Sequence, residues 1–168
     1  MFLNSQANYQ ITRPLVHKTM KPIATTAPSK VWSVDLLDMN DIIGHNSKNR
    51  YIFVCVDVFS RMVWLERMTL KTSEQTASSL RDIIRRAGIQ PDVITSDQGQ
   101  EFQGSFAEFC KEHKIRQNLS RSYSPTENGL VERVNQDIRK ILRAYFVENK
   151  SLRWSSILHE VENNKNET

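Results

Sequence analysis

The chain has 168 residues, of which 39% are hydrophobic and 25% are charged, as expected of one globular domain with its own hydrophobic core. Its formal net charge is +4, and none of its apolar runs approaches the roughly 20 residues that a membrane-spanning helix needs. The N-terminus lacks the pattern of a signal peptide, so a reducing compartment is expected. Cys55 and Cys110, each among apolar neighbours, are accordingly predicted to be buried thiols.

The first part of the chain predicts an arm followed by a meander of strands. Residues 1–30 contain three prolines and four basic residues but no acid, and they are predicted to form a basic extended arm ahead of one folded domain, 31–168. Apolar, β-branched runs then predict three antiparallel strands, 31–39, 51–60 and 62–70, with a turn-rich connection over 42–49.

After residue 70 the hydrophobic period becomes helical. Thr72 and Gln75 fit a capping box, apolar residues recur at helical spacing as far as Ala87, and Gly88 suits the position after a helix end. The elements predicted next are a strand (91–97), a helix (104–113), a short strand (115–120), a loop (122–129), a long amphipathic helix (about 129–149) and a final helix (153–164). This order, β-β-β-α-β-α-β-α-α, predicts an α/β fold: a ribonuclease-H-like mixed five-stranded sheet flanked by helices.

Basic residues gather in two regions, the arm and the stretch from Lys111 to Arg143. Such regions are typical of proteins that bind a phosphate backbone, although a solvated basic surface has the same composition. One polar stripe of the long helix runs through Glu132, Gln136, Arg139 and Arg143 at steps of four, three and four residues. The stripe would suit DNA lying along the helix, but it would equally suit a face turned to solvent.

Three acids lie where a domain of this order could bring them together. Asp35 is central in an apolar strand, where a lone carboxylate is costly unless it is paired or bound to a metal. Asp97 ends the fourth strand, and Glu132 borders the buried stripe near the start of the long helix. Mg²⁺ prefers oxygen ligands, and two such ions can hold both the attacking and the leaving oxygen of a phosphodiester.

Each of these acids also has a structural interpretation. Asp35 could face solvent, Asp97 could form a turn, and Glu132 could favour a helix N-terminus. The rivals for the same role are the nearby acids Asp38, Asp57, Glu101 and Glu127. Asp57 is the strongest rival because it also lies in an apolar strand, whereas Glu127 falls in the predicted loop, where nothing fixes its direction.

Five stretches resemble the catalytic core of retroviral-type integrases, the Asp-Asp-Glu recombinases of retroviruses, retrotransposons and related mobile DNA elements. They are WSVDLLDM, YIFVCVDVFSRMVWLERM, ITSDQGQEF, SYSPTENGLVERVNQDIRKIL and VENNKN, in family order from about Val31 to Asn164. The 34 residues between Asp97 and Glu132 are one fewer than in the commonest retroviral arrangement. DLLDM and DVFSRMVWLERM resemble most the integrases of Maverick/Polinton-class transposons and related viruses.

The resemblance implies that Asp35, Asp97 and Glu132 bind two Mg²⁺ or Mn²⁺ ions beside a mobile loop, 122–129. The DNA-binding residues that it implies, together with the last member of the polar stripe, are Tyr123, Asn128, Asn135, Arg139, Lys140 and Arg143. Family members usually also carry an N-terminal zinc-binding domain and a C-terminal DNA- or chromatin-binding domain, so the chain is interpreted as a fragment or an isolated core.

The expected function is metal-dependent 3′-end processing and DNA strand transfer by phosphodiester transesterification. One alternative is a domesticated or truncated integrase that binds DNA or a partner without catalysis. Another is a ribonuclease-H-like nuclease that cuts RNA–DNA hybrids. The expected partners are element ends, target DNA and further copies of the chain in a homodimer or higher homo-oligomer, with no membrane. The expected location is the nucleus or another site of host DNA.

Overall fold

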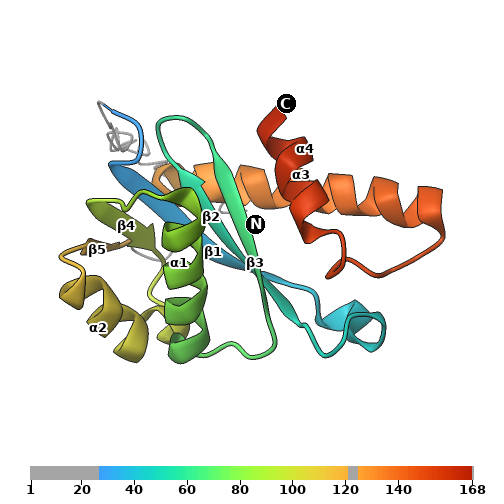
Figure 1. The fold of residues 1–168 in the computed structure, drawn as a ribbon, viewed down its shortest axis with the longest axis horizontal. Coiled ribbons are helices and arrows are strands. Elements are labelled where there is room, and N and C mark those ends of the chain that lie inside the picture. Colours follow the sequence, from blue (N-terminus) through green and yellow to red (C-terminus); the bar gives the residue numbers. More distant parts are fainter. Residues whose placement is uncertain (1–26, 121–124, 168) are drawn as a thin grey trace, which may run out of the picture.

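The computed structural model describes residues 27–120 and 125–167 and shows a five-stranded sheet with helices on both faces (Figure 1). In chain order the elements are β1 (Val31–Asp38), the 3₁₀ helix η1 (Asn40–His45), β2 (Tyr51–Asp57), β3 (Val63–Met68), α1 (Ser73–Ala87), β4 (Val93–Ser96), the 3₁₀ helix η2 (Gln100–Phe102), α2 (Gly104–Glu112), β5 (Arg116–Leu119), α3 (Pro125–Asn149) and α4 (Leu158–Glu167).

The sheet has the order β3-β2-β1-β4-β5, with β1 in the middle. The strand β1 pairs antiparallel with β2 and parallel with β4, while β2–β3 is antiparallel and β4–β5 is parallel. The predicted mixed five-stranded α/β sheet is therefore confirmed, including its antiparallel meander.

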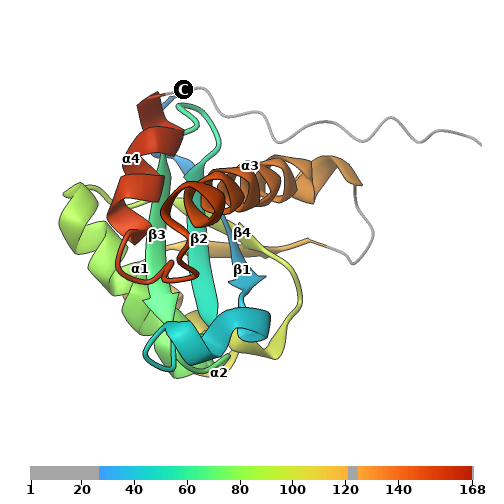
Figure 2. The same ribbon diagram turned by 90° about the vertical axis from the view of Figure 1, so that its right-hand side faces the viewer.

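Each face of the sheet carries its own hydrophobic core, because successive side chains of a strand point to opposite faces. Trp32 and Val34 of β1 pack with α1 and α2, whereas Leu37 of β1 packs with α3 and α4. The result is three layers, with α1 and α2 on one face and α3 and α4 on the other (Figure 2). Cys55 and Cys110 are buried free thiols, as predicted, and burial raises the pKa of Cys110 to about 11.

The ends of α1 follow the predicted capping residues. The Thr72 hydroxyl accepts a hydrogen bond from the Gln75 backbone N–H at 3.4 Å, and Gly88 ends the helix in the left-handed conformation at φ 67°. The Gln75 side chain reaches beyond Thr72, however, and its Oε1 accepts hydrogen bonds from the backbone N–H groups of Thr69 and Leu70. It thereby fixes the segment that leads into the helix.

Several predicted elements differ from the observed ones, and strands β2 and β3 end two to three residues earlier than predicted. The predicted loop 122–129 overlaps α3, which begins at Pro125, because proline has a favourable φ at the first helical position and no N–H to leave unpaired. Residues 153–157 precede α4 instead of starting it, and residues 40–45 form η1. Most of the predicted arm lies outside the described residues. None of the helices described is long and apolar enough to cross a membrane.

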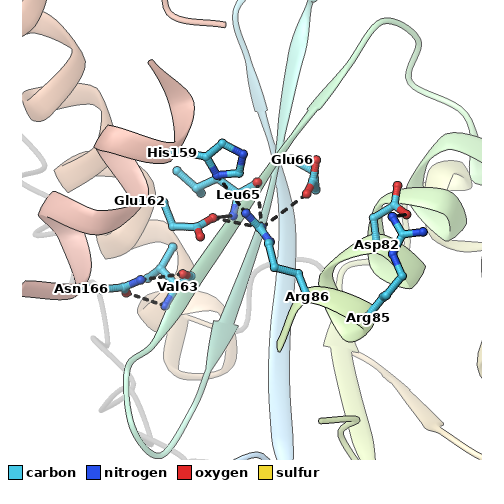
Figure 3. A network of polar contacts seen from close by, with 9 residues as sticks. All are labelled: Val63, Leu65, Glu66, Asp82, Arg85, Arg86, His159, Glu162 and Asn166. Atoms are coloured by element: carbon cyan, nitrogen blue, oxygen red, sulfur yellow. Dashed lines mark hydrogen bonds and ion pairs between the residues drawn. The ribbon is translucent and has the colours of Figure 1, made fainter. Parts of the chain in front are cut away.

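The outer edge of β3 is covered by side chains of α4 and α1 (Figure 3). Asn166 accepts a hydrogen bond from the Val63 N–H at 2.8 Å and donates one to the Val63 carbonyl at 2.9 Å. Glu162 accepts from the Leu65 N–H at 2.6 Å, and Arg86 donates to the Leu65 carbonyl at 3.3 Å. An edge strand is otherwise free to pair with another chain, so these contacts both protect β3 and fix α4 in place.

Candidate active site

Asp35 lies in the middle of β1 on the face covered by α3. Its Oδ1 accepts a hydrogen bond from the Leu36 N–H at 2.8 Å, and its Oδ2 accepts one from Asn135 Nδ2 of α3 at 2.7 Å. Burial is the main cause that raises the pKa of Asp35 above its ordinary value, and the nearby charge of Asp97 adds to this effect. Asp35 is thus a partly buried carboxylate with a second carboxylate close to it.

Asp97 follows directly after β4, the parallel neighbour of β1. The two strands pair Val31 with Val93 and Ser33 with Thr95, and the same offset continued by two residues brings Asp97 level with Asp35. Asp97 Oδ1 accepts a hydrogen bond from the Gly99 N–H at 2.9 Å, which fixes the turn after the strand. Neighbouring strands therefore bring the first two predicted metal ligands together.

Glu132 lies on α3, three residues before Asn135. Its side chain is exposed. In residues 27–120 and 125–167, no three His, Cys, Asp or Glu side chains lie close enough together to hold a metal ion. The structure therefore unites Asp35 and Asp97 but leaves Glu132 outside a three-carboxylate cluster. Asn135 still ties the helix that carries Glu132 to Asp35, which keeps the third acid on the same face of the sheet as the first.

The donor chemistry of the paired aspartates fits a hard divalent cation. Two carboxylates held next to each other and partly out of water repel, and a bound cation would turn this repulsion into attraction. Asn135 Oδ1 is buried and has no hydrogen-bond partner within the described part of the chain. Oxygen ligands are what Mg²⁺ and Mn²⁺ prefer, so Asp35 and Asp97 are suitable first ligands.

Three of the four rival acids have structural partners, and the side chain of the fourth, Glu127, lies outside the described residues. Asp57 is 1% exposed and its carboxylate accepts hydrogen bonds from the N–H groups of Ser29, Phe59 and Ser60, so it organises the turn between β2 and β3. Asp38 accepts from the Asn40 N–H and side-chain amide, 2.8 and 2.7 Å away. The sequence did not separate Asp57 from Asp35, because both are acids in apolar strands.

Glu101 and Lys71 form a feature that the sequence analysis missed. Lys71 Nζ lies 3.0 Å from Glu101 Oε1, and the exposed fractions of the two side chains are 51% and 8%. The positive charge of Lys71 partly opposes the effect of burial, which raises the pKa of Asp35 overall. The two residues are 30 positions apart, Lys71 in the connection before α1 and Glu101 in η2, so no local sequence pattern could have indicated the pair.

The predicted DNA-binding residues are distributed along and before α3. Asn135 contacts Asp35, and Arg139, Lys140 and Arg143 are exposed. Arg139 and Arg143 line a pocket of about 140 Å³ that also involves the end of β1 and η1. Tyr123 and the side chain of Asn128 lie outside the described residues. Beyond Asn135, which contacts Asp35, helix α3 therefore exposes three basic side chains. A surface that binds a phosphate backbone requires such side chains.

Comparison with known proteins connects this site to one family. Residues 25–125, more than half of the chain, match the family model described as the integrase core domain. The match includes Asp35 and Asp97 and ends before Glu132. The chain is 29% identical over 162 residues to the Pro-Pol polyprotein of feline foamy virus, covering 96% of this chain and 14% of that protein. The chain thus spans a small part of this curated relative.

Two solved structures have the same fold. A chain of the simian T-cell lymphotropic virus intasome, in complex with the PP2A regulatory subunit B56 gamma, aligns with a TM-score of 0.70 and 28% identity over 80% of this chain and 47% of that chain. The integrase catalytic core domain of HTLV-2, solved with magnesium in a trimeric form, aligns with a TM-score of 0.62 and 27% identity over 83% of each chain.

Proposed function

Because the chain belongs to the integrase core domain family, we propose that it is the catalytic core of a DNA integrase that performs 3′-end processing and strand transfer. The observation that carries the proposal is the proximity of Asp35 in β1 to Asp97, which directly follows the neighbouring strand β4, beside a helix that bears Glu132 and exposed arginines. The fold, a retroviral-type integrase core, supports the same conclusion.

Within this proposal, each residue of the site has a role. Asp35, Asp97 and Glu132 would hold Mg²⁺ or Mn²⁺, and the HTLV-2 core was solved with magnesium. The bound ions would activate the attacking oxygen and stabilise the leaving oxygen of the phosphodiester. Asn135 fixes the Asp35 carboxylate through its 2.7 Å hydrogen bond. Arg139, Lys140 and Arg143 would position the DNA strand, and no covalent protein intermediate is needed.

The reaction would take place in an assembly on DNA. The structural relatives include an intasome and integrase cores in dimeric and trimeric forms. We propose that this chain likewise works as a homodimer or higher homo-oligomer that binds element ends and target DNA, in the nucleus or at another site of host DNA. Sedimentation that shows only monomer at high micromolar concentration would argue against this assembly.

The test is disintegration of a branched DNA, the reverse of strand transfer, with Mn²⁺ or Mg²⁺ present. Asp97→Asn and Glu132→Gln should each reduce the rate about 100-fold or more, because loss of a metal ligand should cost more than the roughly 10–100-fold lost when a residue that only supports a ligand is changed. Glu127→Gln is the matched control and should keep most of the activity. Unchanged rates in Asp97→Asn and Glu132→Gln would contradict the proposal. Cleavage of an RNA–DNA hybrid, with no action on branched DNA, would instead identify a hybrid nuclease.

A further inference from the structure

Lys71 lies near enough to the paired aspartates to interact electrostatically with both, and the chain holds it from two sides. Its ammonium is 3.0 Å from Glu101 Oε1. The two residues before it, Thr69 and Leu70, donate their backbone N–H groups to Gln75 Oε1, each at 3.0 Å. Both the backbone ahead of Lys71 and the end of its side chain are therefore fixed, which lowers the entropy lost when its ammonium binds a further group.

Glu101 is anchored more firmly than a surface acid would be. It is 7% exposed, and its carbonyl accepts a hydrogen bond from the Thr76 hydroxyl of α1. Its carboxylate packs against the backbone of Gly99, where an added Cβ would lie only 2.6 Å from it. Gly99 in turn donates its N–H to Asp97. Contacts therefore run without a break from Lys71 through Glu101 and Gly99 to Asp97.

The position of Lys71 is not one that a helix alone would favour. The residue precedes Thr72, the N-cap of α1, and the macrodipole makes this end of a 15-residue helix positive. A lysine there and the helix N-terminus repel each other, whereas both attract an anion. The Lys71 side chain is 51% exposed, and its ammonium has three N–H donors. Glu101 Oε1 can take one of them, which leaves donors for a ligand that arrives from solvent.

We propose that Lys71 is a phosphate-binding residue of the active site, held by Glu101 so that its ammonium contacts a phosphodiester of the DNA strand that lies over Asp35 and Asp97. This inference rests on the proposed function, because it takes DNA as the substrate. The competing interpretation is that Lys71 only neutralises the buried carboxylate of Glu101, since removing one partner of a buried ion pair destabilises a protein by itself.

Four variants separate the two interpretations. Lys71→Gln removes the cation, Glu101→Gln removes the anion, and the double variant removes both, so that no buried charge is left unpaired. Lys48→Gln is the matched control, because Lys48 is an exposed lysine in the turn between η1 and β2. A fifth variant, Lys71→Arg, tests whether another cation restores binding, and thermal unfolding of all five shows which of them are fully folded.

The measurement is the salt dependence of branched-DNA binding in EDTA, where no divalent cation takes part. One phosphate contact contributes about 0.9 to the slope of log K against log salt on B-DNA. Lys71→Gln and the double variant should both lower the slope by about 0.9, whereas Glu101→Gln, Lys48→Gln and Lys71→Arg should keep the wild-type slope. A double variant with the wild-type slope and affinity would overturn the inference, since Lys71 would then serve only Glu101.

The outcome is distinct from that of the disintegration test. If the wild-type protein processes branched DNA with Mn²⁺ but Lys71→Gln binds DNA like the wild type, the inference is wrong and the proposed function stands. If the wild type binds DNA without any metal-dependent reaction, and Lys71→Gln lowers the slope, the proposed catalysis is wrong and the phosphate contact stands. A wild-type protein that does not bind branched DNA contradicts both.

Discussion

Arg86→Ala and Arg85→Ala form a matched pair for testing how α4 is held to the sheet. Both arginines lie in the last turn of α1, but only Arg86 reaches another element (Figure 3). Arg86 Nη2 is 3.1 Å from Glu162 Oε2 and 3.4 Å from Glu66 Oε1. Within the described part of the chain, Arg85 pairs only with Asp82, one turn earlier on the same helix, and its side chain is 80% exposed.

The expected magnitudes follow from burial. Removing one partner of a fully buried ion pair costs about 3–5 kcal/mol. The side chain of Arg86 is 30% exposed, so water screens part of its charge. Glu162 also keeps its hydrogen bond from the Leu65 N–H. Arg86→Ala should therefore lower the free energy of unfolding by about 2–3 kcal/mol, whereas Arg85→Ala should change it by at most about 0.5 kcal/mol, as expected of an exposed pair.

Urea unfolding at pH 7, followed by circular dichroism, measures the free energy of unfolding of both variants, and thermal unfolding of the same proteins measures their Tm. For a domain of this size, the loss in Arg86→Ala corresponds to a fall in Tm of about 5–10 °C. Arg85→Ala should unfold within about 2 °C of the wild type. Equal losses in the two variants would refute the reasoning, because the contacts of Arg86 with β3 and α4 would then contribute nothing beyond those of a surface charge.

Three further predictions concern the active site. Burial and the charge of Asp97 raise the pKa of Asp35, so the folded state binds this proton more tightly and the wild type loses stability as pH rises from 3.8 through the raised pKa. Asp35→Asn lacks this loss. In EDTA, its free energy of unfolding should therefore rise relative to that of the wild type between pH 3.5 and pH 7. A difference that stays constant over this range would contradict the expectation. Gly99→Ala should cost about 1 kcal/mol, at the lower end of overpacking costs, because the added Cβ displaces only the Glu101 carboxylate and its ion pair with Lys71. The cost should be smaller in a Glu101→Ala background, and equal costs in both backgrounds would refute the contact. Asn135→Ala should slow disintegration at saturating DNA without weakening DNA binding in EDTA, since Asn135 orients Asp35; the reverse pattern would make it a DNA ligand.

The fold could be predicted from the sequence because its signals are local and repeated. Apolar β-branched runs predicted β1, β2 and β3, and the cap residues Thr72 and Gly88 predicted α1 to within one residue. The start of α3 was wrong because the stretch from 122 to 129 has the composition of a loop. A proline such as Pro125 usually indicates the end of a helix or a loop, but at the first position of a helix it is favourable.

The active site could be predicted only in part. The pattern placed Asp35 in the middle of the first strand and Asp97 at the end of the fourth, and the parallel pairing of these two strands in the sheet brings the residues together. What separates Asp35 from Asp57 is a set of turn hydrogen bonds to Asp57 that only the folded chain shows. The Lys71–Glu101 pair depends on the packing of η2 against α1, which no local spacing encodes.

The most direct test of the central claim is a crystal structure with bound Mn²⁺, located by its anomalous signal. We expect an anomalous peak between the carboxylates of Asp35 and Asp97, with Glu132 turned toward it on α3. The Asp97→Asn protein, crystallised in the same way, should lose the peak. Strong Mn²⁺ peaks elsewhere in the wild-type crystal, with none between Asp35 and Asp97, would contradict the claim that these aspartates form the metal site of an integrase.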